Sequence, residues 1–404
     1  MTSNTRVVVI GAGLAGVRLA RRLGELGTPA LLVGEEEHRP YNRVLLAEVL
    51  AGRYAPEVIA LPAPGGLVRA RVTGIDRAAR RLRCADGSQI AYGTLVLATG
   101  SNPVLPPLRG LFTADRRLPE GVHAFRTMDD CLGLSKAVRP GARAVVVGGG
   151  LLGVSAARAL AVRGAQVVLA QQSERLMERQ LDPNASRLVL RHLRDLGVEV
   201  HPECRVRDVR CVGGAVRSVE MADGYALDAD LVVLACGVHP RTGLAEQAGL
   251  AVRKGVVVDD ELRTSDPHIH AVGDCAQHDG TVYGLAAPAL EQAEALAGLL
   301  AGDAAARYTG TRSLTRLTLT GPDVPFDLAA FGETEALPGD DVVQLADATR
   351  GTYRKVVVRD DRLVGGVLVG ELGTVGALAR AWEGAEPLPG EGPLLHLLTN
   401  DGGS

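Results

Sequence analysis

Two glycine-rich segments are the residues of this sequence best suited to chemistry. Residues 11–16 read GAGLAG, and residues 148–153 read GGGLLG. In a GxGxxG loop, the first glycine allows a tight turn, the second lets a phosphate approach the backbone, and the third lets the following helix pack closely on the preceding strand. The positive end of that helix then faces the phosphates. One such loop is a weak signal, but two loops, each between strand-like and helix-like residues, predict two dinucleotide-binding sites.

An acidic residue about 20 positions beyond such a loop commonly binds the adenosine ribose. Glu35 follows Gly11 by 24 positions and is the predicted ribose ligand of the first unit. In the second unit the matching position, 23 after Gly148, holds Gln171, which can hydrogen-bond a hydroxyl group but carries no charge. Arg175 could reach a 2′-phosphate, or it could be an ordinary surface arginine. The sequence therefore leaves the choice between NADH and NADPH open.

The surrounding sequence supplies the same positioning elements twice. Residues 6–10 predict a buried strand, a helix is expected to about residue 26, and residues 30–33 predict a second strand. Residues 144–147, a helix to about residue 162 and a strand at 166–169 repeat this order. A repeated βαβ unit is typical of parallel sheets covered by helices.

Shorter segments complete the organisation. Residues 80–84 before Asp86-Gly87 predict a hairpin, and Asn102-Pro103 is expected to break regular structure where the chain crosses between lobes. A long helix is expected from about Pro288 to Leu300. From about residue 308, alternating Leu and Thr and a strand pair around Asp360-Asp361 are typical of an antiparallel domain.

These patterns predict an α/β protein with two Rossmann-like dinucleotide-binding domains, the first split in sequence by insertion of the second, and a small α+β C-terminal domain. The expected parts are 1–110 (first domain, first part), 111–238 (inserted second domain), 239–307 (first domain, second part) and 308–404 (C-terminal interface domain).

Composition narrows the range of partners. A formal net charge of -3 without a basic block argues against nucleic acid or an anionic membrane as the main partner. No apolar run reaches the roughly 18 residues of a membrane span, and the N-terminus lacks the features of a signal peptide, so a cytoplasmic location is expected. The 6 cysteines have neither CxxC nor zinc spacing, so no metal site is predicted.

Two further motifs carry a family resemblance. Together with the glycine loops, Ala98-Thr99-Gly100 and Ala271-Val272-Gly273-Asp274 resemble the pyridine-nucleotide–disulfide oxidoreductase superfamily. In that superfamily the first lobe holds FAD and the second NADH or NADPH. The resemblance implies that Asp274 closes the FAD site by hydrogen-bonding the ribityl and pyrophosphate region.

Three segments resemble one branch more closely. Residues 40–46 (PYNRVLL), 176–182 (LMERQLD) and 283–288 (YGLAAP) are similar to the N-terminal flavoprotein module of NAD(P)H-dependent nitrite reductase large subunits, and less closely to rubredoxin and ferredoxin reductases. The resemblance covers about residues 5–375. It implies that Arg43 lies along FAD, with a surface salt bridge as the alternative. The helix near Pro288 would direct its N-terminus, including the backbone of Glu291, at the flavin.

The sequence departs from these relatives at several points. It has no cysteine set for an iron–sulfur cluster, so it is not expected to reduce nitrite alone. Thiol chemistry is not expected either, because the first-lobe cysteine before the hairpin turn, Cys84, lies in the hairpin strand itself. Ferredoxin reductases carry a Lys–Glu ion pair beside flavin N5, and the matching positions resemble Glu48 and Ser155. That ion pair is therefore expected to be lost.

The predicted FAD contacts are Gly11, Gly13, Leu14, Ala15, Gly16, Glu35, Arg43, Ala98, Thr99, Gly100, Gly273, Asp274, Pro288 and Glu291. The predicted NAD(P) contacts are Gly148, Gly150, Leu151, Leu152, Gly153, Gln171, Arg175 and Gly237.

The resemblance implies an NAD(P)H:acceptor reductase, in which FAD takes a hydride and passes electrons to a separate protein such as a ferredoxin, a rubredoxin, or a nitrate or nitrite reductase. Two alternatives stay open: an FAD oxidoreductase that acts directly on a small molecule, and a non-catalytic flavin-binding partner subunit. The C-terminal domain is expected to mediate acceptor docking or formation of a homodimer. Within that domain, Trp382 is either a core residue or an exposed contact.

Overall fold

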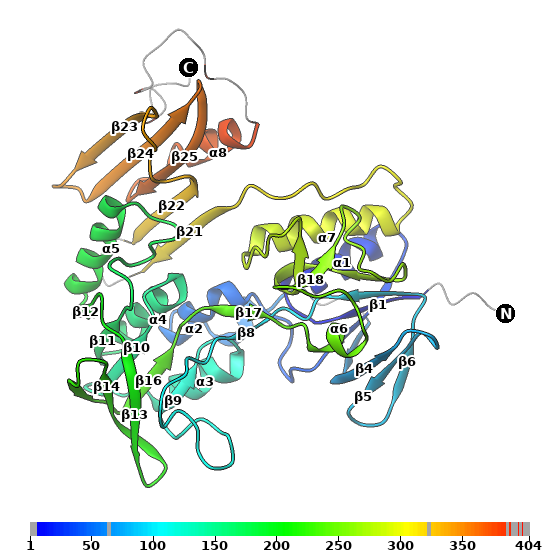
Figure 1. Cartoon of the computed structure of the whole chain (residues 1–404), viewed down its shortest axis with the longest axis horizontal. Coiled ribbons are helices and arrows are strands. Elements are labelled where there is room, and N and C mark those ends of the chain that lie inside the picture. The colour runs from blue at the N-terminus through cyan, green and yellow to red at the C-terminus, as the bar shows by residue number, and fades with distance from the viewer. Residues whose placement is uncertain are drawn as a thin grey trace.

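The computed structural model describes residues 6–62, 66–320 and 325–384, together with residues 388, 395 and 398 (Figure 1). Two lobes lie side by side, and a third domain lies against one of them. The order of elements confirms the expected α/β architecture with parallel sheets and an antiparallel C-terminal domain.

The first lobe is built on a five-stranded sheet of order β19-β7-β1-β2-β3, in which every strand pair is parallel. Helices α1 (Leu14–Glu25) and α7 (Ala286–Leu300) pack together beside this sheet. All four residues of β1 are buried, which is why its sequence is continuously apolar. The strands are β1 (Val7–Ile10), β2 (Ala30–Gly34), β3 (Leu67–Arg69), β7 (Thr94–Leu97) and β19 (Ile269–Ala271).

The second lobe repeats this plan with the order β12-β11-β10-β16-β9, again with parallel pairs. Its strands are β9 (Val122–Ala124), β10 (Arg143–Val147), β11 (Gln166–Ala170), β12 (Glu199–His201) and β16 (Leu231–Leu234). Its helices are α3 (Met128–Ala137), α4 (Leu151–Val162) and α5 (Pro183–Asp195).

Each lobe also carries a three-stranded antiparallel sheet. The predicted hairpin at Asp86-Gly87 is confirmed by the second and third strands of the first of these sheets. The strands are β4 (Val72–Asp76), β5 (Arg81–Cys84) and β6 (Gln89–Ala91) in the first lobe, and β13 (Val206–Val212), β14 (Ala215–Met221) and β15 (Ala226–Asp228) in the second.

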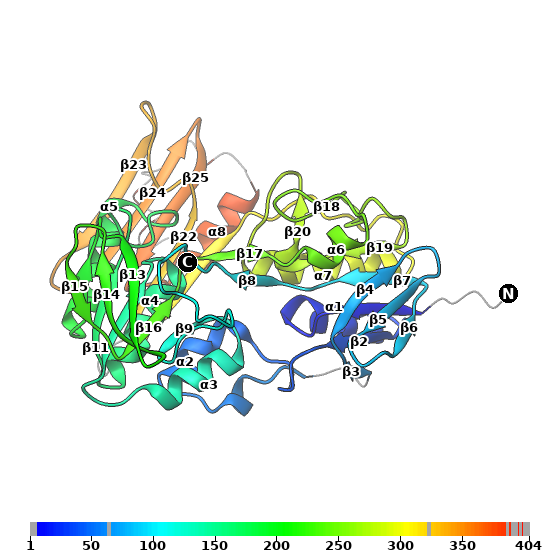
Figure 2. The ribbon, with the colours of Figure 1, turned by 60° about the horizontal axis from the view of Figure 1, so that its bottom comes forward.

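A two-stranded ribbon carries the chain between the lobes (Figure 2). Strand β8 (Ser101–Pro103) leaves the first lobe, and β17 (Val238–Pro240) returns to it, antiparallel to β8. The crossing point is therefore as expected, but the prediction that Asn102-Pro103 breaks regular structure is wrong. A ribbon of two edge strands tolerates proline, because an edge strand does not need every backbone N–H group.

Smaller elements complete the two lobes. They are η1 (Arg43–Leu45), α2 (Leu46–Leu50), η2 (Pro56–Ile59), α6 (Gly243–Gln247), β18 (Val256–Val258), η3 (Gly273–Cys275) and β20 (Ala276–His278). Leu46 and Leu50 of α2 share a hydrophobic core with α3 and α4, so a segment of the first 110 residues packs against the second lobe.

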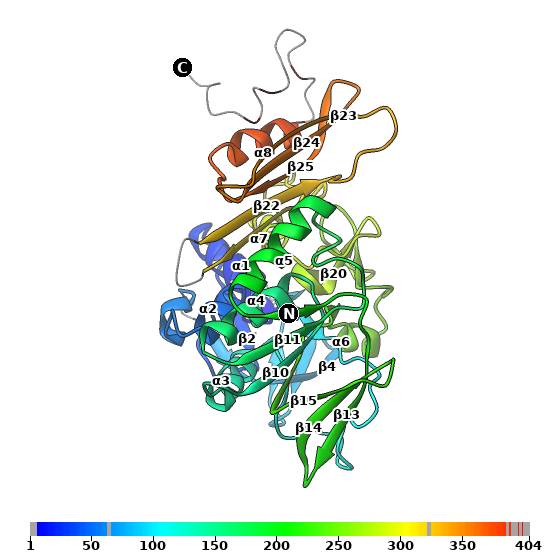
Figure 3. The ribbon, with the colours of Figure 1, turned by 90° about the vertical axis from the view of Figure 1, so that its left-hand side faces the viewer.

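The C-terminal domain is a five-stranded antiparallel sheet of order β21-β22-β25-β24-β23, followed by α8 (Val375–Gly384). It lies against α5 of the second lobe (Figure 3). Trp382 is 8% exposed and contacts Phe331, which supports its interpretation as a core residue. The strands are β21 (Leu314–Leu319), β22 (Phe326–Gly332), β23 (Asp341–Asp347), β24 (Thr352–Arg359) and β25 (Arg362–Val369).

A buried polar contact fixes this domain on the second lobe. The hydroxyl group of Tyr353 donates to Asp182 over 2.6 Å, and Lys355 Nζ lies 3.2 Å from the same carboxylate. Asp182 also accepts a hydrogen bond from the backbone N–H of Ala185 and so caps α5.

The Tyr353→Phe substitution is expected to lower the free energy of unfolding by about 2 kcal/mol, because it removes a buried hydrogen bond to a charged group. Chemical denaturation measures the change. The matched control is Tyr225→Phe, since Tyr225 is 61% exposed and should show no change. Equal stability of the two variants would mean that the Tyr353 contact does not stabilise the domain interface.

Candidate functional site

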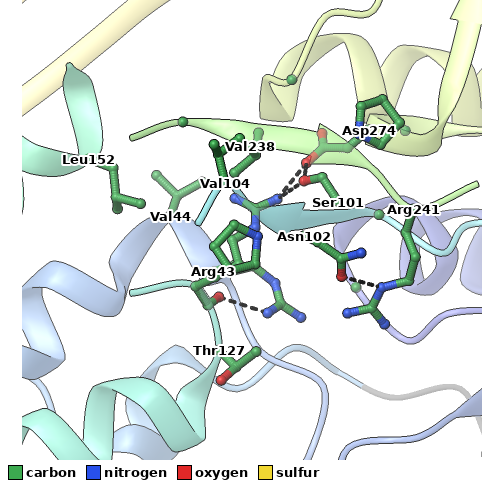
Figure 4. A pocket seen from close by; sticks show the side chains of 18 of the residues that line it. Arg43, Val44, Ser101, Asn102, Val104, Thr127, Leu152, Val238, Arg241 and Asp274 are labelled. Carbon is green, nitrogen blue, oxygen red and sulfur yellow. Dashed lines mark hydrogen bonds and ion pairs between the residues drawn. The ribbon is translucent and has the colours of Figure 1, made fainter. Parts of the chain in front are cut away.

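A single cavity of about 2250 Å³ is lined by both glycine loops and by residues of all three domains. A site for one drug-sized ligand usually has a volume of about 300–1,000 Å³. This cavity therefore has room for two dinucleotides. Figure 4 shows part of its wall, where side chains from both lobes converge.

The first glycine loop has the geometry that phosphate binding requires. Gly11 has φ +114°, and a Cβ atom there would lie 2.0 Å from the carbonyl oxygen of Ala98. A Cβ on Gly16 would lie 1.9 Å from the carbonyl oxygen of Gly11, whereas a Cβ on Gly13 would meet nothing within 4 Å. The first and third glycines are thus required by turn and packing, and the second borders open space.

The second loop repeats this geometry. Gly148 has φ +107°, and a Cβ there would lie 2.5 Å from the carbonyl oxygen of Ala235. A Cβ on Gly153 would lie 1.8 Å from the carbonyl oxygen of Gly148, and a Cβ on Gly150 would again meet nothing within 4 Å. The third glycines, Gly16 and Gly153, do not line the cavity, which agrees with a packing role.

Both helices that follow the loops begin at the cavity without a side-chain cap. Gly13 caps α1 and Gly150 caps α4, and neither position supplies a side-chain acceptor for the first turn. The N–H groups of a first helical turn have no partner within the helix. Both helix N-termini are therefore available to bind phosphate oxygens.

The two strand ends that follow the loops differ in charge. Glu35 lines the cavity directly after β2, and its carboxylate lies 2.5 Å from Nη1 of Arg241. Gln171 follows β11 and is buried, where its Oε1 accepts from the N–H of Gly149 over 2.7 Å and its Nε2 donates to the carbonyl oxygen of Arg175 over 3.2 Å. Both polar atoms of its carboxamide thus already have hydrogen-bond partners within the protein.

Arg175 does not line the cavity. Its guanidinium lies 2.9 Å from the carboxylate of Glu335 in the C-terminal domain. The structure therefore brings Arg175 to the domain interface, and not to the nucleotide site for which the sequence suggested it.

Asp274 is the centre of a charged network in the cavity wall (Figure 4). Its carboxylate accepts from the hydroxyl group of Ser101 over 2.8 Å and from Nη2 of Arg126 over 2.5 Å. Arg43 donates to the backbone carbonyl of Arg126 over 2.8 Å and to Glu36 over 2.6 Å. Two arginines thus lie beside one another at the position that the sequence assigns to FAD.

Arg126 has capacity to bind a ligand. Burial lowers the pKa of its guanidinium, and the carboxylate of Asp274 opposes that shift. Its Nε atom is buried and has no hydrogen-bond partner among the residues that the structure describes. Since such donors are normally paired, an orphaned donor in a cavity wall fits an anionic group such as a pyrophosphate.

The sequence did not identify Arg126, Ser101 or Arg241 as site residues. Arg126 and Asp274 are separated by 148 positions, so no local pattern links them. One signal was present: Thr127 and Asp130 form a capping box at the start of α3. That motif indicates where the helix begins, but not that the preceding arginine reaches the cavity.

Glu48 and Ser155 occupy different environments. Ser155 lines the cavity, and its hydroxyl group donates to the carbonyl oxygen of Leu151 over 2.8 Å. Glu48 does not line the cavity and instead forms a buried ion pair with Arg158, one turn beyond Ser155 on α4. Glu48 and Ser155 thus form no ion pair with each other, and α2 and α4 are joined instead by a different pair, with the acid, Glu48, on α2 and the base, Arg158, on α4.

This ion pair reaches all three domains. The hydroxyl group of Thr320, at the end of β21, donates to Glu48 over 2.9 Å, and Nη1 of Arg158 donates to the carbonyl oxygen of Thr320 over 3.2 Å. Arg158 is 1% exposed. The contact holds α2, α4 and β21 together directly behind the cavity wall that Ala47 and Ser155 form.

The N-terminus of α7 also meets the cavity. Ala286, Ala287 and Ala289 line it, whereas the predicted contacts Pro288 and Glu291 do not. Glu291 accepts instead from the hydroxyl group of Thr311 over 2.6 Å. The backbone of this 15-residue helix, and not those side chains, faces the site, and its dipole would stabilise negative charge there.

The remaining residues predicted to contact the cofactors line the cavity. They are Gly11, Gly13, Leu14, Ala15, Glu35, Arg43, Ala98, Thr99, Gly100, Gly148, Gly150, Leu151, Leu152, Gln171, Gly237, Gly273 and Asp274. Leu314 to Leu317 of the C-terminal domain complete the wall.

The described residues contain neither a cluster of metal-ligating side chains nor a membrane-spanning helix. No group of three or more His, Cys, Asp or Glu side chains there could hold a metal ion. No helix in the same part of the chain is both long and apolar enough to cross a membrane.

Comparison with known proteins agrees with this geometry. Residues 5–293 match the family described as pyridine nucleotide-disulphide oxidoreductase, and residues 317–383 match the rubredoxin NAD+ reductase C-terminal domain. The assimilatory nitrate reductase electron transfer subunit of Bacillus subtilis (strain 168) is 34% identical over 91% of this chain and 48% of its own length. The chain spans less than half the length of this relative and of the similar nitrite reductases of Bacillus subtilis, Klebsiella oxytoca and Escherichia coli.

Other relatives match along most of their length. A probable ferredoxin reductase of Castellaniella defragrans (strain DSM 12143 / CCUG 39792 / 65Phen) is 31% identical over 90% of both chains. Among solved structures, the covalent putidaredoxin reductase–putidaredoxin complex matches with a TM-score of 0.85 and 26% identity, over 98% of this chain and 99% of the other.

Proposed function

The chain belongs to the pyridine nucleotide-disulphide oxidoreductase family, and from this premise we propose that it is an NAD(P)H-dependent flavoprotein reductase that passes electrons to a separate redox protein. Members of this family bind FAD and NAD(P)H. When both are bound, they supply hydride transfer from nicotinamide to flavin and onward transfer of electrons.

One observation carries the proposal: two glycine loops with the same phosphate-binding geometry face one cavity. Gly13 and Gly150 both border open space, and each begins a helix whose first turn has no side-chain cap. A single-substrate enzyme would need one such loop. Two loops on one cavity fit two dinucleotides that must meet.

The residues of this chain bind and orient these groups. In the first lobe, Glu35 would hydrogen-bond the adenosine ribose, and Arg43 and Arg126 would neutralise the pyrophosphate beside Asp274. The N-terminus of α7 would stabilise negative charge on the reduced flavin. Leu152 and Val44, which line the same cavity, would exclude water between the two cofactors.

The acceptor is the part of the proposal that rests on the relatives. The relative in Castellaniella defragrans is named a ferredoxin reductase, and one in Alcanivorax borkumensis is named a rubredoxin-NAD(+) reductase. Since this chain covers 90% of the first and 95% of the second, we propose a small iron–sulfur or iron protein as its acceptor. The nitrate and nitrite reductase relatives, which are more than twice as long as the matched region, suggest a nitrate or nitrite reductase as an alternative acceptor.

We further propose a cytoplasmic location and a division of labour among four segments. The 6 cysteines are free, which suits a reducing compartment. Segments 1–110 and 239–307 would bind FAD, 111–238 would bind NAD(P)H, and 308–404 would contact the acceptor or a second copy of the chain.

Steady-state turnover with different acceptors tests the proposed function. With NAD(P)H as donor, we expect a ferredoxin or a rubredoxin to be reduced faster than menadione, because a protein acceptor can dock near the flavin. Faster reduction of menadione than of either protein would favour direct action on a small molecule. If NAD(P)H reduced the flavin but none of these acceptors were reduced, the proposal that the chain passes electrons to a small iron–sulfur or iron protein would be contradicted.

A further inference from the structure

We propose that the nucleotide site of the second lobe selects NADPH over NADH, and that Arg205 and Arg179 bind the 2′-phosphate of its adenosine ribose. This inference rests on the proposed function, because it specifies the nucleotide of that same site. A carboxylate at the end of the second strand binds the ribose 2′-hydroxyl group of NADH, whereas an arginine nearby accommodates the 2′-phosphate of NADPH.

The second lobe has no carboxylate at that strand end. Gln171 takes the place that Glu35 has in the first lobe, and its side chain is bound to Gly149 and to the backbone of Arg175. It is 9% exposed. The side chain therefore neither repels a phosphate by charge nor projects over the ribose position to bind its hydroxyl groups.

Backbone hydrogen bonds hold Arg205 beside this strand end. The N–H of Cys204 donates to the carbonyl oxygen of Gln171 over 2.8 Å, and the N–H of Glu203 donates to that of Ser173 over 3.1 Å. Arg205 directly follows this pairing and lines the cavity. Its position is thus fixed by the fold and not by a flexible loop.

Arg179 belongs to the segment that follows β11. The N–H of Met177 donates to the carbonyl oxygen of Gly149 over 2.9 Å, and the hydroxyl group of Ser173 donates to Glu178 over 2.5 Å. These contacts hold the segment before Arg179 against both the glycine loop and the strand end. Arg179 also lines the cavity and is exposed.

Both guanidinium groups are available for a ligand. Within the part of the chain that the structure describes, neither Arg179 nor Arg205 forms a side-chain hydrogen bond or ion pair. Glu178 is the one acidic side chain in the cavity wall formed by residues 170–180 and 204–206, so the two arginines give this end of the cavity a net positive charge. Two unpaired arginines beside an uncharged strand end fit a phosphate, which they can bind through charge-assisted hydrogen bonds.

The test is anaerobic stopped-flow reduction of the FAD-loaded protein by NADPH and by NADH. We expect the reduction rate constant divided by the dissociation constant to be at least about ten-fold higher with NADPH, which corresponds to about 1.4 kcal/mol. The double variant Arg179→Gln/Arg205→Gln should lose most of this preference by binding NADPH more weakly, with little change for NADH. Arg253→Gln, an exposed arginine outside the cavity, is the matched control and should behave as the unsubstituted protein.

A preference for NADH, or equal losses with both nucleotides in the double variant, would overturn the inference. Calorimetric binding of 2′,5′-ADP and 5′-ADP separates it from the proposed function. Tighter binding of 2′,5′-ADP that depends on the two arginines would support the inference, whether or not either coenzyme reduces the flavin. Failure of both coenzymes to reduce the flavin would contradict the proposed function instead. Equal binding of the two compounds would contradict the inference.

Discussion

A Gly150→Ala substitution is expected to weaken NAD(P)H binding on the order of a hundred-fold while leaving FAD bound. A Cβ atom at Gly150 meets nothing within 4 Å in the protein, and the φ angle there, −77°, suits alanine. The new methyl group would instead occupy the space through which a phosphate approaches the backbone. Losing a backbone hydrogen bond to a charged phosphate costs about 1.5–3 kcal/mol, which at its upper end is on the order of a hundred-fold in the dissociation constant.

The stability of this variant should not fall. Replacing glycine by alanine where the backbone tolerates it usually stabilises a protein by about 0.4–1 kcal/mol, because the unfolded chain loses freedom. The dissociation constant of NAD(P)H and the FAD content of the purified protein are the two measurements. Gly133→Ala is the control, since a Cβ there also meets nothing within 4 Å but Gly133 lies on α3 outside the cavity.

The same substitution at the first loop should have the reciprocal effect. Gly13 has the same open surroundings as Gly150, so Gly13→Ala is expected to yield a folded protein that loses FAD. Loss of FAD from Gly150→Ala with retention by Gly13→Ala would mean that the two lobes exchange the roles proposed for them.

Glu48→Gln is expected to destabilise the protein by about 3–5 kcal/mol. The substitution leaves Arg158, which is 1% exposed, as a buried charge without its carboxylate. Removing one partner of a buried ion pair typically has an effect of this size, because the remaining charge is not solvated. Thr320 still offers Arg158 its carbonyl oxygen, but a neutral acceptor compensates for only part of the loss.

Denaturant unfolding of FAD-saturated protein measures this effect. Glu57→Gln, at an exposed position 9 residues further along the chain, is the matched control and should be neutral. The double variant Glu48→Gln/Arg158→Met should recover part of the lost stability, because it removes the unpaired charge altogether. A double variant that is as unstable as the sum of the two single variants would show that Glu48 and Arg158 stabilise the protein independently.

The sequence predicted the two βαβ units well because their signals are local. The strand before each loop is apolar, apart from Arg143 at the start of β10, and in the structure all four residues of β1 are buried. The loop glycines are also dictated by neighbours a few residues away, such as the carbonyl oxygen of Gly11 against Gly16. Helices α1 and α4 therefore begin within glycine motifs that could be recognised from spacing alone.

The charged contacts of the site could not be predicted in the same way. Glu48 and Arg158 are 110 positions apart, and Arg126 and Asp274 are 148 apart. Such pairs form only when the lobes close on each other, so nothing near either residue in the sequence indicates its partner. For the same reason the sequence could not decide whether Arg175 is a nucleotide ligand or a surface arginine, whereas in the structure the C-terminal domain supplies Glu335 as its partner.

Asn102-Pro103 shows a different limit of local reasoning. Proline and asparagine favour turns and loops, yet these residues form β8 because β17 returns beside them. A strand whose partner lies more than 100 residues away leaves no hairpin signal in the sequence. The crossing between lobes was predictable from composition, but its pairing was not.

Anaerobic titration of the FAD-loaded protein with NADPH, followed by NADH, tests the central claim most directly. We predict that loss of flavin absorbance is complete near one equivalent of NADPH per FAD, because both loops serve one cavity. If dithionite bleached the flavin but neither nucleotide did, the second loop would not deliver a nicotinamide to the flavin, and the account of this protein as an NAD(P)H-dependent reductase would be contradicted.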